Sequence, residues 1–184
     1  MLVIHPKDKT TKILSLLYDE EDAKLITQSQ SGHEIERAFH HCPRKERIML
    51  LGHGSDKGLF SKEDATDKDF DRIIVGHPQT YYLRRHGSNV IGIWCHADLF
   101  ARKEGLHGLF SGMIISDRQE AESYGTITLQ YYIDETNETM FRKLRKLLDE
   151  GCPLCDIPRI MKELRDTTVY NPIAKFNYES FFYL

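Results

Sequence analysis

His53 and Cys95 are the residues of this chain whose positions favour joint chemistry, because each directly follows an apolar stretch. The first stretch, RIMLLG at 47–52, leads into His53, and the second, NVIGIW at 89–94, leads into Cys95. A cysteine thiol is mostly protonated at neutral pH, and a nearby imidazole can take its proton as the sulfur attacks a carbonyl carbon. A thiol beside an imidazole is therefore suited to nucleophilic acyl transfer.

The two stretches have the length of strands and are apolar enough to be covered on both faces, as in a parallel sheet. Elsewhere predicted strands alternate with predicted helices, which is typical of βαβ units. In open sheets of this kind the ligand crevice lies at the carboxyl ends of the strands. We therefore expect an α/β fold, a three-layer α/β/α sandwich with a mostly parallel central sheet, that brings His53 and Cys95 to one edge.

Hydrophobic patterning and turn residues predict the remaining elements. Ser31 and Glu34 have the spacing of a capping box at the start of a helix. Residues 55–71 are polar, and we expect them to form a loop that is the segment most prone to disorder. Strands are expected at 1–4, 23–27, 47–52, 72–75, 89–94, 107–116 and 173–184, and helices at 10–18, 31–41, 79–86, 135–150 and 157–167.

Composition limits the class of protein. The 184 residues suggest one domain, 1–184, with a real core. The net charge of −3 gives no electrostatic argument for a nucleic acid or an anionic membrane as partner. The first residues, MLVIHP, lack the basic region and long apolar segment of a signal peptide, and four cysteines do not make a disulfide scaffold. We expect a reduced, cytoplasmic protein.

Gly54 follows His53 directly and has a backbone N–H that no Cβ shields. If the two strands are neighbours, this N–H and the amide of Cys95 can point at the same oxygen atom. Two such donors would form an oxyanion hole for the tetrahedral intermediate of acyl transfer.

An apolar strand ending in His-Gly, followed by an apolar strand ending in Cys, resembles the caspase-like superfamily of cysteine peptidases, which includes caspases, gingipains, legumains, separase and CHAT domains. The motifs here are MLLGHG at 49–54 and IGIWCH at 91–96, and the similarity in topology extends over about residues 1–130. The resemblance implies a flavodoxin-like strand order and a His53–Cys95 dyad with the amides of Gly54 and Cys95 as oxyanion donors. It implies a peptidase that cleaves peptides or proteins through a thioacyl intermediate, without a cofactor or a metal. The family usually has a small residue before the nucleophile, where this chain has Trp94.

Two acidic residues are candidates for substrate binding. Asp56 lies just past His53-Gly54, and Asp117 lies at the end of the next predicted strand. In the caspase-like family the sheet beside the dyad contributes to the specificity pocket, so these carboxylates would favour a basic residue on the acyl side of the scissile bond. The alternative is that both are solvated loop carboxylates.

Other interpretations remain open. The chain could be a non-catalytic member of the same fold that uses the strand ends for binding or regulation. The GHGS sequence at 52–55 is also similar to the histidine motif of sirohydrochlorin-type chelatases, in which His53 would bind a metal. Cys152 and Cys155 form a C-x-x-C that could be half a zinc site or a redox pair. His77 could line the same crevice as the dyad.

Overall fold

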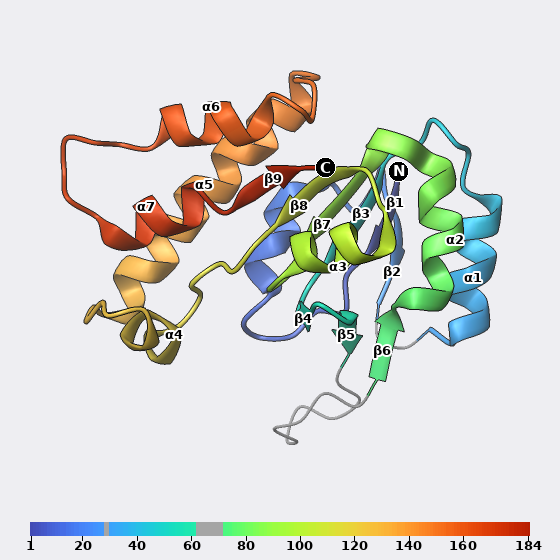
Figure 1. Cartoon of the computed structure of the whole chain (residues 1–184), viewed down its shortest axis with the longest axis horizontal. Helices are drawn as coiled ribbons and strands as arrows, with labels where there is room; N and C mark the ends of the chain where they lie inside the picture. Colours follow the sequence, from blue (N-terminus) through green and yellow to red (C-terminus); the bar gives the residue numbers. More distant parts are fainter. Residues whose placement is uncertain (28–29, 62–71) are drawn as a thin grey trace.

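A computed structural model describes residues 1–27, 30–61 and 72–184 of the chain. Its centre is a six-stranded sheet in the order β2-β1-β3-β7-β8-β9 (Figure 1). The strands are β1 (Leu2–Ile4), β2 (Lys24–Ile26), β3 (Ile48–Leu51), β7 (Val90–Ile93), β8 (Gly108–Ser111) and β9 (Phe181–Tyr183). The first five strands in this order pair in parallel, and β9 pairs antiparallel with β8. The expected α/β fold with a mostly parallel sheet is confirmed, and the parallel strands have the order of a doubly wound sheet.

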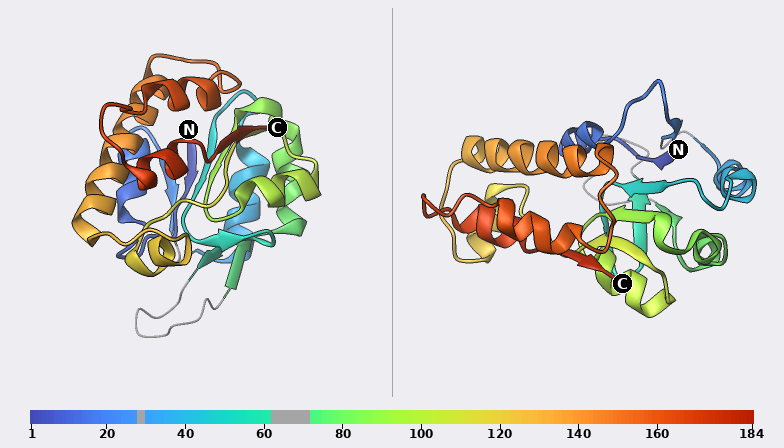
Figure 2. Two further views of the ribbon diagram at one scale, coloured as in Figure 1. Left: turned by 60° about the vertical axis from the view of Figure 1, so that its left-hand side comes forward. Right: turned by 90° about the horizontal axis from the view of Figure 1, so that it is seen from above.

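Helices cover both faces of this sheet, as Figure 2 shows from above. One face carries α1 (Gly32–His41), α2 (Thr80–Leu83) and α3 (Ala97–Glu104); the other carries the 3-10 helix η1 (Lys12–Leu17) and the helices α5 (Gln130–Asp149), α6 (Ile157–Leu164) and α7 (Pro172–Tyr178). Successive strand residues point to opposite faces. In β3, for example, Ile48 and Leu50 join the first core and Met49 and Leu51 join the second. This two-sided burial explains the uninterrupted apolar stretches of the sequence.

A second, smaller sheet follows His53 directly. It contains β4 (Gly54–Ser55), β5 (Gly58–Ser61) and β6 (Arg72–Val75), which pair antiparallel. The strand predicted at 72–75 is therefore present but belongs to this sheet and not to the central one. The prediction of a loop over 55–71 is wrong for β5, and the part of the prediction that concerns residues 62–71 lies outside the described residues. The small sheet fixes the chain on the carboxyl side of His53.

Several other elements differ from expectation. Helix α3 starts two residues after Cys95 and was not expected, and α4 (Arg118–Ser123) also lies outside the predicted helices. The strand expected at 107–116 ends at Ser111. The segment 173–184 is a strand only in its last part, because α7 occupies Pro172–Tyr178. Two further 3-10 helices, η2 (His77–Gln79) and η3 (Arg84–Asn89), flank α2.

The helices of 1–27, 30–61 and 72–184 include none with both the length and the apolar character that a bilayer crossing requires.

Buried asparagines hold the segment that follows β8. Asn177 of α7 accepts a hydrogen bond from the Ile115 N–H at 2.9 Å and donates to the Ile115 carbonyl at 2.9 Å. Asn137 of α5 donates to the same carbonyl and accepts a hydrogen bond from Asn177 at 2.7 Å. Both side chains are almost fully buried, so each backbone group of Ile115 is satisfied away from water. Helices distant in sequence thus fix the path of the chain from Gly112 to Asp117.

We predict that Asn177→Ala lowers the free energy of unfolding by about 2–4 kcal/mol, because it leaves the Ile115 N–H and the Asn137 carbonyl oxygen buried without this partner. Denaturant unfolding measures the change. The control is Asn171→Ala, which removes the side-chain cap of the same helix and should cost only about 1 kcal/mol. If the two variants lost the same free energy of unfolding, the buried asparagine network would stabilise the protein no more than the helix cap does.

Candidate active site

His53 and Cys95 line one cavity at the carboxyl ends of the parallel strands. The cavity has a volume of about 50 Å³ and receives residues from the segments that follow β1, β3, β7 and β8. These four strands are consecutive neighbours in the sheet. The direction of the chain crossovers reverses between β1 and β3, and this switch point is where doubly wound sheets bind ligands. The structure therefore brings the two sequence-predicted residues together.

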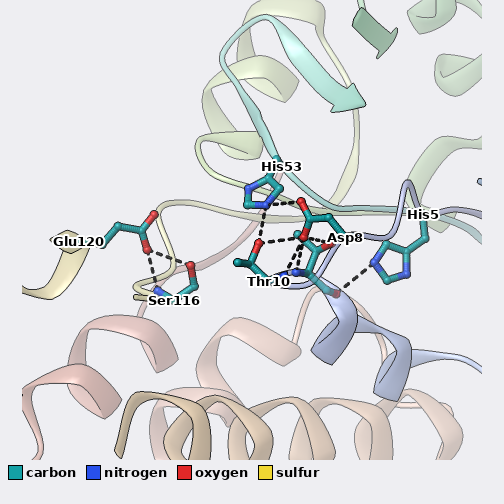
Figure 3. Close-up of polar contacts among 7 residues, drawn as sticks. His5, Asp8, Thr10, His53, Ser116 and Glu120 are labelled. Atoms are coloured by element: carbon teal, nitrogen blue, oxygen red, sulfur yellow. Dashed lines mark hydrogen bonds and ion pairs between the residues drawn. The ribbon is translucent and has the colours of Figure 1, made fainter. Parts of the chain in front are cut away.

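The imidazole of His53 is held by the segment that follows β1. Its Nε2 lies 2.8 Å from Oδ2 of Asp8 and 2.7 Å from Oγ1 of Thr10 (Figure 3). A carboxylate only accepts hydrogen bonds, and the Thr10 hydroxyl donates to the other oxygen of Asp8. The proton of a neutral His53 ring is therefore assigned to Nε2, which leaves Nδ1 as an acceptor. In this tautomer Nδ1 is the ring nitrogen that would receive a proton.

Asp8 is itself fixed by a tight turn. Its Oδ1 accepts hydrogen bonds from the backbone N–H and the hydroxyl of both Thr10 and Thr11, at 2.8–3.1 Å. Burial alone would raise the pKa of Asp8, but the bonds from His53, Thr11 and Thr10 hold it well below its ordinary value of 3.8. The carboxylate is thus ionised at neutral pH. Sequence analysis missed Asp8, although an Asp followed by threonines is a known signal for such a turn.

His5 supports this turn from the core. It is fully buried, its Nδ1 lies 3.0 Å from the Tyr18 hydroxyl, and its Nε2 lies 3.1 Å from the Thr11 carbonyl oxygen. Burial and the charge of Lys7 lower the pKa of His5 to about 4. His5 therefore stays neutral at physiological pH and holds the chain by hydrogen bonds without adding charge beside Asp8.

Cys95 lies in the turn between β7 and α3. The next residue, His96, has φ 66°, in the left-handed region that residues with a Cβ rarely adopt. Strained backbone of this kind is found preferentially at functional sites. Burial raises the pKa of the Cys95 thiol to about 11, with the carboxylates of Glu120 and Asp117 adding to the shift and backbone N–H groups opposing it. At neutral pH the group is a thiol and needs a base to become a nucleophile.

Trp94 joins the end of β7 to the segment after His53. Its Nε1–H donates to the Ser55 carbonyl at 3.0 Å, and its backbone N–H and carbonyl both bond to Oγ of Ser111. The indole lies against Gly54 so closely that a Cβ at position 54 would be 2.2 Å from Cδ1 of Trp94 and 2.4 Å from the Gly58 carbonyl oxygen. The indole of Trp94 can therefore occupy this position only because residue 54 is a glycine.

Gly54→Ala should destabilise the protein by about 1–3 kcal/mol, because the added methyl group has no room between the indole and a backbone carbonyl. Thermal or denaturant unfolding gives the value. Gly32→Ala is the matched control: its Cβ would meet nothing within 4 Å, so a gain of about 0.4–1 kcal/mol is expected from the lower chain entropy of the unfolded state. A neutral Gly54→Ala would refute the close packing against Trp94.

The other predicted site residues lie further out. Asp117 caps α4, where its Oδ1 accepts a hydrogen bond from the Glu120 N–H at 2.8 Å. Asp56 is exposed in the turn between β4 and β5 and borders a separate hollow, together with His77. The Nδ1 of His77 lies 2.8 Å from a carboxylate oxygen of buried Glu104. A role of Asp56 or Asp117 in substrate binding stays a prediction.

The zinc and chelatase interpretations concern Cys152, Cys155 and His53. In the described parts of the chain, no group of three or more His, Cys, Asp or Glu side chains is placed to hold a metal ion. Cys152 and Cys155 follow the end of α5 as free thiols, and Cys155 is exposed. The Nε2 of His53 already contacts Asp8 and Thr10. These positions give the chelatase and zinc interpretations no support.

Comparison of the sequence with family models and with curated proteins gave no match. The interpretation of the site therefore depends on its geometry.

Proposed function

We propose that this protein is a cysteine peptidase-like hydrolase of caspase-like architecture, with Cys95 as nucleophile, His53 as base and Asp8 as the residue that positions His53. The observation that supports it most is that Cys95 shares a cavity with an imidazole whose Nε2 is held by an ionised carboxylate. A nucleophile, a base and a third group that orients the base form the pattern of activated nucleophiles. The substrate is a peptide or a protein.

The proposed reaction has two stages. Nδ1 of His53 takes the proton of the Cys95 thiol as the sulfur bonds to the scissile carbonyl carbon. The carbon–nitrogen bond then breaks, the imidazolium gives its proton to the leaving amine, and a thioester remains on Cys95. In the second stage His53 takes a proton from a water molecule, which attacks the thioester carbon. The carbon–sulfur bond then breaks, the acid leaves, and the imidazolium returns its proton to the sulfur of Cys95. Asp8 stabilises the imidazolium formed in each stage.

The developing oxyanion needs hydrogen-bond donors. The amides of Gly54 and Cys95 are proposed for this role, since Gly54 follows the base directly and the indole of Trp94 links the two segments. Preorganised donors of this kind lower the barrier by a few kcal/mol. The resemblance to caspase-like peptidases, with the histidine before the cysteine, is consistent with this assignment.

The four free thiols of the chain fit a reducing compartment, and we propose the cytoplasm.

A non-catalytic binding module of the same fold is the second candidate. The observation that favours it is the pKa of Cys95, which burial raises and the carboxylates of Glu120 and Asp117 raise further, so that the thiol stays protonated. The two candidates differ in whether His53 activates the sulfur.

Cys95→Ala should abolish peptide hydrolysis, because no other group of the cavity can form the thioester. The measurement is turnover of a fluorogenic peptide mixture by the purified chain. Cys155→Ala, which changes an exposed thiol remote from the cavity, should leave turnover unchanged. Hydrolysis that survives in Cys95→Ala would discard the mechanism, and a wild-type protein that cleaves no peptide would favour the binding module.

Asp8→Asn should lower kcat by about 10²–10⁴-fold, because an asparagine can present its N–H₂ group to Nε2 and stabilise the wrong tautomer of His53. Asp166→Asn is a matched control: Asp166 also accepts hydrogen bonds from the N–H and hydroxyl of a threonine two residues later, but it lies outside the cavity. Steady-state kinetics of both variants measures the effect. Equal kcat values in the two variants would remove Asp8 from the mechanism.

The stability of the Asp8→Asn variant, compared with that of wild type, should also depend on pH. The pKa of Asp8 is lowered in the folded state, so its contribution to stability is complete above the ordinary value of 3.8 and is lost as the pH falls from there toward the lowered value. The stability gap between wild type and Asp8→Asn should therefore be present at neutral pH and shrink in acid. Denaturant unfolding at a series of pH values tests this, and a gap that widens in acid would contradict the lowered pKa.

A further inference from the structure

The cavity beside Cys95 is mainly apolar. The apolar side chains that line it come from η1, from β7 and its end, from the segment after β8 and from α5: Ile13, Leu14, Ile93, Trp94, Ile114 and Phe141. All of them except Trp94, which packs in the first core, lie on the face of the sheet that α5 and η1 cover, so the cavity is an opening into the second core. A group entering it would leave water and contact hydrocarbon.

Besides His53 and Cys95, four polar side chains line the cavity, and each of them already has a partner within the protein. The hydroxyls of Thr10 and Thr11 bond to Asp8, the hydroxyl of Ser116 bonds to Glu120, and Asn137 bonds to the Ile115 carbonyl and to Asn177. These bonds direct the polar atoms toward the protein's own groups. A ligand group in the cavity therefore gains more from apolar contact than from hydrogen bonding.

We propose that this cavity is the specificity pocket of the site and receives a small aliphatic side chain, of the size of alanine or valine, from the residue on the acyl side of the scissile bond. The inference rests on the proposed function. The volume of about 50 Å³ is well below the roughly 150 Å³ of an apolar cavity that holds benzene, so aromatic side chains are too large. A lysine or arginine would have to bury its charge among apolar groups, which is costly without a paired carboxylate.

This pocket predicts a different substrate from the two acidic residues named in the sequence. Asp117 uses its carboxylate to cap α4, and Asp56 borders the separate hollow near His77. Neither belongs to the lining of the cavity at Cys95. The preference for a small aliphatic group and the preference for a basic residue can therefore be separated by experiment.

The test uses methanethiosulfonates that carry a propyl, a benzyl or a trimethylammonium-ethyl group. In each case the thiolate of Cys95 attacks the reagent's thiol-side sulfur, a mixed disulfide forms and methanesulfinate leaves. Peptide mass spectrometry gives the labelling rate of Cys95, divided by the rate of the same reagent with N-acetylcysteine; exposed Cys155 in the same protein is a second reference. The thiolate fraction of Cys95 is the same for every reagent and cancels.

We expect the normalised rate at Cys95 to be about tenfold or more higher for the propyl reagent than for the other two, which is the discrimination that a tight apolar pocket can supply. Phe141→Ala should enlarge the cavity and raise the relative rate of the benzyl reagent about tenfold. Leu144→Ala, which removes another buried side chain of α5 that does not line the cavity, should not change the order. Ile114→Ala, at a half-buried position, replaces Phe141→Ala if that variant does not fold.

Equal normalised rates for the three reagents, or the fastest rate for the cationic one, would overturn the pocket assignment. A second experiment separates the pocket assignment from the proposed function. It measures the cleavage of peptides that differ only in having valine, phenylalanine or lysine on the acyl side of the scissile bond. Cleavage that is fastest after lysine would overturn the pocket while the peptidase stands. An aliphatic preference in the labelling without any peptide cleavage would support the pocket and count against the peptidase.

Discussion

The contact between Asp8 and Nε2 of His53 is the interaction on which the rest of the site depends. It fixes the proton on Nε2, makes Nδ1 the ring nitrogen that would accept a proton, and places a negative charge where an imidazolium would form. The contact joins the segments after β1 and β3, the strands between which the sheet topology switches direction. The turn that holds Asp8, and the neutral His5 behind it, keep this carboxylate in place.

The sheet supplies position, and local polar contacts supply orientation. Because β1, β3, β7 and β8 pair in parallel, the four chain segments that follow them lie at one edge of the sheet. Different contacts hold each of these segments in place. The Asp8 turn locks the first, the small sheet β4–β6 and the packing of Trp94 on Gly54 lock the second. The left-handed residue His96 and the start of α3 lock the third, and the buried asparagines lock the fourth. The cavity at Cys95 is the space that these segments leave between them.

The sequence predicted what depends on local patterning. The two strands that end at His53 and Cys95 are visible because both of their faces are buried, and the capping box of Ser31 and Glu34 is present as expected at the start of α1. Helix α3 was missed because it starts from a strained His96 without a side-chain cap. The strand over 107–116 was predicted too long because asparagines far along the chain, and not hydrogen bonds to a neighbouring strand, hold Ile115. Helix α7 was mistaken for a strand on its aromatic alternation, although Asn171 followed by Pro172 marks a helix start. The role of Asp8 needed the tertiary structure, since Asp8 follows β1 and its partner His53 follows β3.

The most direct test of the account is whether His53 activates Cys95 in the intact protein. A peptidyl acyloxymethyl ketone reports activation, because the sulfur displaces its carboxylate only when the site aligns and deprotonates the thiol, whereas excess iodoacetamide at high pH reports accessibility alone. The rates at Cys95 are compared in wild type and His53→Ala by mass spectrometry. The account predicts that His53→Ala loses labelling by the ketone at neutral pH by about 10²-fold or more and keeps labelling by iodoacetamide. Equal ketone labelling in both proteins would contradict it.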